Sequence, residues 1–165
     1  MNNYFEQYSK FQRWMENHPA LIQILRWFNR CTVVVMYLSY VVMVATMACL
    51  RGLWAYPVLL VPGVGFILLT IVRKSLNAPR PYEKSGIEPL IKRGKKGDSF
   101  PSRHVFSATV ISMVALWIAW PFGVVLMVLS VLLACARVMG GVHYPRDVVA
   151  GMLAGVICGL FLWMF

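Results

Sequence analysis

Four stretches of the chain contain no charged residue, and they restrict the fold more than any other feature. They cover residues 31–50, 52–72, 105–136 and 148–165. A helix needs about 20 apolar residues to cross a bilayer, so the first, second and fourth stretches each suit one crossing. The third is too long for one crossing, and we predict a break at Trp120 and Pro121, because proline begins a helix well and disfavours helical geometry in the residue before it. The pattern predicts about five transmembrane helices.

The composition agrees with a membrane protein. Hydrophobic residues make up 59% of the chain and charged residues 13%, and the mean hydropathy is +0.67. Soluble domains contain about 25% charged residues. We therefore expect a single domain, residues 1–165, with an all-α fold. It is an integral membrane helical bundle that crosses the cytoplasmic (inner) membrane of the cell several times.

Residues 1–28 mix polar and apolar side chains and differ from the later spans. Tyr4, Tyr8, Phe11 and Met15 recur at helical spacing, and charged residues occupy other positions around the helix. Pro19 interrupts this pattern. We predict an amphipathic helix on the membrane surface, followed by a segment that leads into the first span.

The long polar segments between the spans fall on one side of the predicted bundle. Two crossings separate the basic loop at 73–104 from the segment at 137–147, so both emerge at the same membrane face. Fifteen of the 16 Lys and Arg residues, all except Arg51, also lie on that face. Because this charge of +10 flanks membrane spans, we expect the bilayer and a lipid phosphate as partners and no nucleic acid.

A short polar stretch at 99–104 stands directly before the third span. Pro101 and Ser102 favour the start of a helix with Ser102 as its N-cap, so Arg103 and His104 fall in the first turn. Backbone N–H groups there point outward and attract anions. With an arginine fork and a histidine that exchanges protons near neutral pH, the stretch suits a phosphate site, and taken alone it suits an ordinary helix cap with an unrelated histidine equally well.

A second polar group joins the fourth and fifth spans. Arg137 closes the fourth span, and Pro145 is well placed to open the fifth. His143 then lies just outside a helix N-terminus and close to Asp147. Charges at a membrane edge are costly and tend to be functional, although each arginine taken singly also suits an interfacial anchor.

These residues resemble the three-part signature of the type 2 phosphatidic acid phosphatase superfamily, which is related to vanadium haloperoxidases and bacterial acid phosphatases. Its motifs are a lysine, six residues and Arg-Pro; then Pro-Ser-Gly-His; then Ser-Arg, five residues, His, three residues and Asp. The matching residues here are Arg73 with Arg80-Pro81, then Pro101-Ser102-Arg103-His104, then Ala136-Arg137 with His143 and Asp147.

Three positions depart from the signature. Arg73 stands in place of the lysine and keeps its charge, although the adjacent Lys74 is an alternative. Arg103 stands in place of the glycine and adds bulk and charge. Ala136 stands in place of the serine and lacks its hydroxyl.

The resemblance implies a metal-independent lipid phosphatase without a cofactor. It implies that His143 attacks phosphorus to form a phosphohistidine, that Asp147 orients His143, and that His104 protonates the leaving oxygen and then activates water. The phosphate oxygens are expected to contact Arg73, Lys74, Arg80, Ser102, Arg103 and Arg137.

Several alternatives stay open at this point. The resemblance implies a polyprenyl diphosphate, phosphatidylglycerol phosphate or phosphatidic acid as the substrate. The rival functions are a lipid phosphotransferase and a non-catalytic carrier or scaffold for anionic lipids. The charge distribution favours a cytoplasmic site, whereas many bacterial relatives of the superfamily are understood to act on the outer face. The sequence does not define the oligomeric state. The basic cluster at 92–96 is expected to contact solvent or lipid headgroups.

Overall fold

The structure is a computed structural model that describes residues 2–85, 88–91 and 96–165, and these residues form helices joined by short connections. Positions 92–95 of the basic cluster lie outside this range. In chain order the elements are α1 (Asn2–Glu16), α2 (Pro19–Arg51), the 3₁₀ helix η1 (Gly52–Ala55), α3 (Tyr56–Leu76), α4 (Pro81–Ser85), α5 (Arg103–Ile118), α6 (Trp120–Met139), α7 (Pro145–Leu160) and the 3₁₀ helix η2 (Phe161–Met164). The predicted all-α fold is confirmed.

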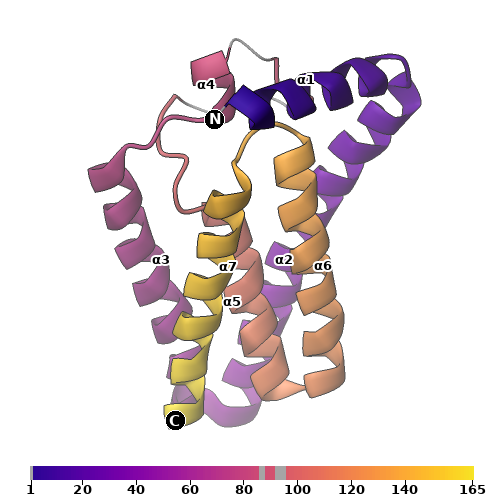
Figure 1. Cartoon of the computed structure of the whole chain (residues 1–165). Helices are drawn as coiled ribbons and strands as arrows, with labels where there is room; N and C mark the ends of the chain where they lie inside the picture. Colours follow the sequence, from indigo (N-terminus) through magenta and orange to yellow (C-terminus); the bar gives the residue numbers. More distant parts are fainter. Residues whose placement is uncertain (1, 86–87, 92–95) are drawn as a thin grey trace.

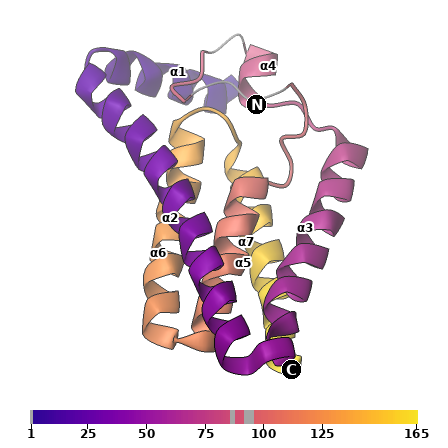
Figure 2. The same ribbon diagram turned by 180° about the vertical axis from the view of Figure 1, so that it is seen from behind.

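Helix α5 forms the centre of the bundle. Every residue of it from Val105 to Ala115 is buried, and α2, α3, α6 and α7 surround it (Figures 1 and 2). A helix that is apolar on all sides is stable only when other helices or lipid enclose it. Three helical stretches in the described part of the chain are long and apolar enough to cross a membrane, namely Pro19–Lys84, which includes α2 and α3, Trp120–Met139 and Pro145–Met164, while α5 is a shorter apolar helix.

The break in the third apolar stretch lies one residue before the predicted position. Helix α5 ends at Ile118, Ala119 is extended with φ −151° and ψ 93°, and α6 begins at Trp120. Pro121 occupies the first turn of α6, where a missing backbone N–H leaves no helical hydrogen bond unmade. Pro121 therefore lies inside the start of α6, and Ala119 is the residue that separates α5 from α6.

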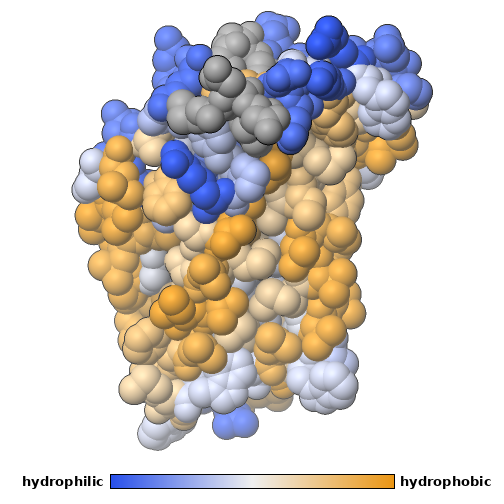
Figure 3. Space-filling view, in the orientation of Figure 1, coloured by the Kyte–Doolittle hydropathy of each residue, from blue (hydrophilic) through white to orange (hydrophobic). Residues whose placement is uncertain are grey.

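Helix α1 lies across one end of the bundle (Figure 1). Two residues of its predicted apolar face, Tyr8 and Met15, are buried, whereas Trp14 is half-exposed. Helix α2 begins at Pro19 and continues to Arg51, so residues 19–28 belong to the same helix as the first span. Polar side chains gather at the end that carries α1 and α4, and apolar side chains cover the flank below them (Figure 3).

Three glycines spaced four residues apart bring α7 close to α5. A Cβ atom on Gly151 would lie 2.5 Å from the carbonyl oxygen of Ser102, and Cβ atoms on Gly155 and Gly159 would lie 2.7 and 2.3 Å from side-chain atoms of α5. Such distances leave no room for a methyl group. The first of these contacts holds the start of α5 against the start of α7, where the polar motifs meet.

Candidate active site

The three polar motifs meet at the end of the bundle that α1 covers. The end of α3 and the segment after it supply Arg73 and Arg80, the start of α5 supplies His104, and the α6–α7 connection supplies His143 (Figure 1). The topology predicts this common end, and the structure has it. The backbone N–H of Ser102 donates to the carbonyl of Asp147 at 2.8 Å, which joins the second motif to the third.

His143 forms a buried polar triad with Asp147 and Ser99. Ser99 Oγ donates to Asp147 Oδ2 at 2.5 Å and lies 3.4 Å from His143 Nδ1, which is 3.6 Å from the same carboxylate oxygen. Because Ser99 gives its single proton to the carboxylate, it can only accept from the imidazole. This places the proton of neutral His143 on Nδ1 and leaves Nε2 with a free lone pair.

Asp147 owes its position to the start of α7. Its Oδ2 also accepts from the backbone N–H of Tyr144 at 3.1 Å in a capping box, and Arg146 Nε lies 3.6 Å from Oδ1. Pro145 opens this helix, as its sequence position predicts. The cap fixes the carboxylate on the side of the helix that faces His143.

Burial controls the protonation of His143. The ring is 1% exposed. This burial, with a smaller contribution from the charges of Arg137 and Arg80, outweighs the opposing hydrogen bond and charge of Asp147 and lowers the pKa of His143 from 6.5 to about 4. The imidazole is therefore neutral at physiological pH.

His104 is paired with an arginine from the third motif. Arg137 Nη2 lies 3.4 Å from His104 Nδ1, and Arg137 Nη1 donates to Asn29 Oδ1 of α2 at 3.3 Å. A guanidinium only donates, so Nδ1 of His104 is the acceptor and neutral His104 carries its proton on Nε2. His104 is thus a neutral imidazole in this arrangement, and it can act as an acid only after it takes up a further proton.

Arg73 and Arg80 brace the loops as well as supplying charge. Both side chains are buried. Arg73 donates to the carbonyls of Pro101 and Asp98, and Arg80 donates to those of Gly97 at 3.0 Å and Val142 at 3.4 Å. Much of their donor capacity is thus directed at the backbone of the loop before α5 and of the α6–α7 connection.

The remaining predicted site residues differ in their surroundings. Ser102 is the N-cap of α5, as predicted, but within the described part of the chain its buried hydroxyl makes no capping bond and has no hydrogen-bond partner. Arg103 is exposed and lies 5.5 Å from the ring centre of Phe66. Lys74 is exposed and does not line the cavity described next.

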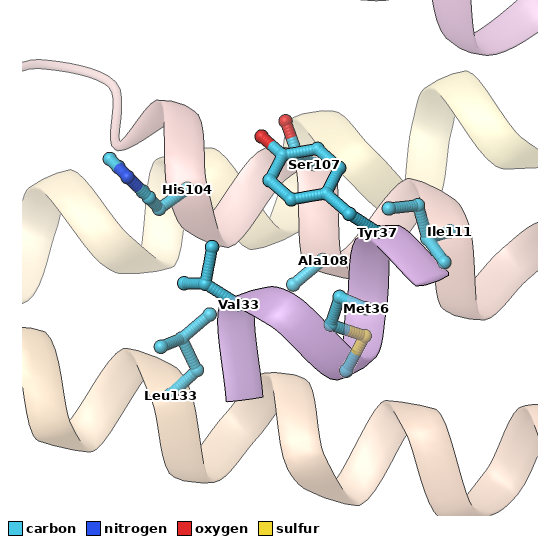
Figure 4. Close-up of a pocket in the computed structure, with 8 residues that line it drawn as sticks. All are labelled: Val33, Met36, Tyr37, His104, Ser107, Ala108, Ile111 and Leu133. Atoms are coloured by element: carbon cyan, nitrogen blue, oxygen red, sulfur yellow. The ribbon is translucent and has the colours of Figure 1, made fainter. Parts of the chain in front are cut away.

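A cavity of about 890 Å³ lies between these motifs and α2. Its lining residues are Arg26, Asn29, Arg30, Val33, Val34, Arg73, Arg80, Pro89, Ile91, Asp98, Arg103, His104, Arg137 and Val142. His143 is not among these lining residues, and its ring is buried behind them. Figure 4 shows the other side of His104, where a small pocket is enclosed mainly by apolar side chains of α2, α5 and α6.

Helix α1 packs on the connection that carries His143. Tyr8 Oη donates to the carbonyl of Met139 at 3.1 Å, and Met15 belongs to an apolar cluster with Val142. Gly141 has φ +70°, and a Cβ atom there would lie 2.3 Å from Tyr8 Oη. Glycine at this position therefore provides both the backbone conformation and the space for Tyr8.

Sequence reasoning missed Ser99, Asn29 and Arg26 as site residues. Ser99 precedes the second motif by two positions, which is the one local signal available. Asn29 and Arg26 lie on α2, far from the motifs in sequence, and only the folded chain brings them to the cavity. In the part of the chain that the structure describes, no group of three or more His, Cys, Asp or Glu is placed to hold a metal ion.

Together, fold and site define a polytopic membrane protein with a cationic, histidine-containing cavity at one end of a helical bundle. The sequence comparison is specific: the family model of the PAP2 superfamily matches residues 37–165. The chain belongs to the PAP2 superfamily, and the resemblance to type 2 phosphatidic acid phosphatases is confirmed.

Two curated relatives are similar over part of their length. The chain is 29% identical over 105 residues to the undecaprenyl-diphosphatase BcrC of Bacillus subtilis strain 168, a match to 61% of this chain and 52% of that protein. It is 48% identical over 64 residues to the putative undecaprenyl-diphosphatase YbjG of Escherichia coli K12, a match to 36% of this chain and 31% of that protein. The chain thus spans about half the length of these relatives or less.

Two crystal structures share the fold. LpxE of Aquifex aeolicus has a TM-score of 0.66 at 22% identity, with 88% of this chain and 94% of that chain covered. The transmembrane PAP2 type phosphatidylglycerolphosphate phosphatase of Bacillus subtilis has a TM-score of 0.65 at 21% identity, with 99% and 94% covered. At this identity the similarity establishes the architecture.

Proposed function

We propose that the protein is a lipid phosphatase that hydrolyses a phosphate monoester or diphosphate through a phosphohistidine on His143. The observation that carries the proposal is the buried Ser99–Asp147–His143 triad, which keeps a neutral histidine with its Nε2 lone pair free. A neutral imidazole oriented by a carboxylate is a suitable nucleophile.

In the proposed reaction, His143 Nε2 attacks phosphorus and the bond to the leaving oxygen breaks. When Arg137 turns to the phosphate, Nδ1 of His104 takes up a proton from solvent. The imidazolium then gives its Nε2 proton to the leaving oxygen and becomes neutral, so the lipid leaves as an alcohol or a phosphate. His104 then removes a proton from water, which attacks the phosphohistidine and releases orthophosphate. Asp147 stabilises the positive charge that develops on His143.

The arginines around the cavity would bind the transferring phosphoryl group without a metal or a cofactor. We assign this role to Arg73, Arg80 and Arg137, with secondary contacts from Ser102 and Arg103. Their guanidinium forks match phosphate oxygens in shape and charge. Binding requires Arg73 and Arg80 to redirect donors that now contact loop carbonyls, and the same movement would open the path to His143. Lys74, outside the cavity, is assigned to lipid headgroups.

A polyprenyl diphosphate is the substrate that we place first, because both curated relatives carry names of undecaprenyl-diphosphatases. Phosphatidylglycerol phosphate and phosphatidic acid come next. We also propose that the protein lies in the cytoplasmic membrane with its site toward the cytoplasm, since the basic residues gather at that end. Labelling Lys96 with a membrane-impermeant amine reagent in sealed vesicles of known orientation tests the side.

The first test of the function is phosphate release by the purified protein in detergent with EDTA present. Undecaprenyl diphosphate, phosphatidylglycerol phosphate and phosphatidic acid serve as substrates, beside the variant H143A. We expect release that survives EDTA and disappears in H143A. Equal release by the variant, or transfer of phosphate to a second lipid without free phosphate, would contradict the proposal.

A further inference from the structure

The cavity has a second basic wall that none of the three motifs explains. Arg26, Asn29 and Arg30 line it from α2. Residues three and four apart share one face of a helix, so their side chains point the same way. All three lie outside the residues 37–165 that the family model matches. This wall, which we call the α2 wall, therefore calls for its own explanation.

Two contacts tie the α2 wall to the site. Arg26 Nε donates to the carbonyl of Leu90 at 2.7 Å, which holds the guanidinium at the cavity although the side chain is exposed. Asn29 Oδ1 accepts from Arg137 Nη1 at 3.3 Å, so the wall adjoins the arginine that contacts His104. Arg26 and Asn29 are thus built into the polar network, while Arg30 is exposed and lines the cavity beside them.

The charge in the cavity exceeds what one phosphate neutralises. Six arginines line it, and Asp98 is the one carboxylate among the lining residues that the structure describes. A phosphate group carries about −1.5 to −2 at neutral pH. Like charges gathered in one cavity repel, and a second anionic group relieves that repulsion. A volume of about 890 Å³ also leaves space beyond a single phosphate.

We propose that the α2 wall is a second anion subsite, which binds a phosphate carried by the leaving group. The proposal rests on the function proposed above and narrows its substrate class. When His143 attacks the terminal phosphorus of a lipid diphosphate, the bond to the bridging oxygen breaks, and the lipid monophosphate leaves with its remaining phosphate on Arg26 and Arg30. Water then releases orthophosphate from His143. A phosphomonoester with an uncharged leaving group makes no such contact.

The test compares matched substrates with one and two phosphates. Farnesyl diphosphate and farnesyl monophosphate form one pair, and phosphatidylglycerol phosphate and phosphatidic acid form the other. For R26Q/R30Q we expect kcat/KM to fall about 10- to 100-fold on farnesyl diphosphate, the size of a lost hydrogen bond to a charged group, and less than about threefold on the monophosphate. The second pair shows whether a phosphodiester near the terminal phosphate uses the same subsite.

Three further variants keep the result interpretable. R13Q removes a cation from an exposed position of α1 at the same end of the bundle. It should leave the ratio of kcat/KM between diphosphate and monophosphate substrates unchanged. R26K/R30K keeps both charges and should retain most of the preference. R30Q alone leaves the bond from Arg26 to Leu90 intact, so it serves as the test if the double variant folds poorly. It should lower the ratio of kcat/KM on diphosphate to kcat/KM on monophosphate, as the double variant does.

The outcomes separate the two proposals. An equal loss on mono- and diphosphate substrates, or no loss on either, overturns the subsite while wild-type hydrolysis still supports the proposed function. A wild-type protein that hydrolyses none of the four lipids overturns the proposed function itself.

Discussion

Ser99 and Ser102 are both fully buried in the candidate site, yet their hydroxyls have different surroundings. Ser99 donates to Asp147 and accepts from His143, whereas the hydroxyl of Ser102 has no partner among the residues that the structure describes. A hydroxyl that satisfies a buried carboxylate stabilises the fold, while an unpartnered hydroxyl contributes little and is available to a ligand.

This contrast predicts stability effects of different size for two chemically identical substitutions. S99A should lower the free energy of unfolding by about 1–3 kcal/mol, because Asp147 loses a buried donor. S102A should change it by less than about 0.5 kcal/mol and act instead on KM. Thermal unfolding in detergent and phosphate-release kinetics measure the two effects. Equal destabilisation by both substitutions would contradict the assignment.

His143 gives the site a defined response to acid. Its pKa of about 4 in the folded protein lies below 6.5 in the unfolded chain. The unfolded state therefore binds more protons between these values, so this residue makes stability fall as the pH is lowered from about 6.5 toward 4. His143, the nucleophile that we propose, stays neutral until the pH approaches 4.

We expect protonation of His143 to lower kcat/KM only as the pH falls through about 4. The pH profile of kcat/KM should show no decrease near 6.5 from this residue. The unfolding midpoint should drop between pH 6.5 and 4.5, and this drop should be smaller in H143Q, which has no imidazole to protonate. The unfolding midpoints of the wild type and H143Q are measured without substrate, so protonation of the substrate phosphate does not affect their comparison. An identical drop in both proteins would show that His143 has an ordinary pKa.

Helix α7 positions the site through its glycines. Gly151 faces the carbonyl of Ser102, and Asp147 lies one turn earlier on the same helix. Close contact between α5 and α7 thereby sets the distance between the second and third motifs. The constraint belongs to the helix pair, because no single catalytic side chain enforces it.

The substitution G151A tests that constraint. Its Cβ would lie 2.5 Å from a backbone oxygen, so α5 and α7 must separate. We expect a loss of about 1–3 kcal/mol in stability from overpacking and a clear loss of kcat. G63A in α3 is the matched control, since a Cβ there has no neighbour within 4 Å. Retained activity in G151A would show that the motifs tolerate a shift between the helices.

At the scale of the whole molecule, the sequence predicts the bundle and the motif residues, because charge-free length and motif spacing are local signals. It does not predict that Arg73 and Arg80 donate to loop carbonyls, that Asn29 contacts Arg137, or that glycines of α7 face α5. Each of these depends on the distance between helices that are remote in sequence. The residues of a site are therefore easier to predict than the contacts that hold them.

The unequal distribution of charge between the two ends of the bundle has a further consequence. Arg51 lies at the far end, and the other lysines and arginines that the structure describes lie at the end of the cavity. Inverting the inserted protein would require those cations to cross hydrocarbon, which is very costly. The enzyme that we propose thus serves one leaflet for its lifetime. A lipid made or released in the opposite leaflet becomes a substrate only after a separate flippase carries it across.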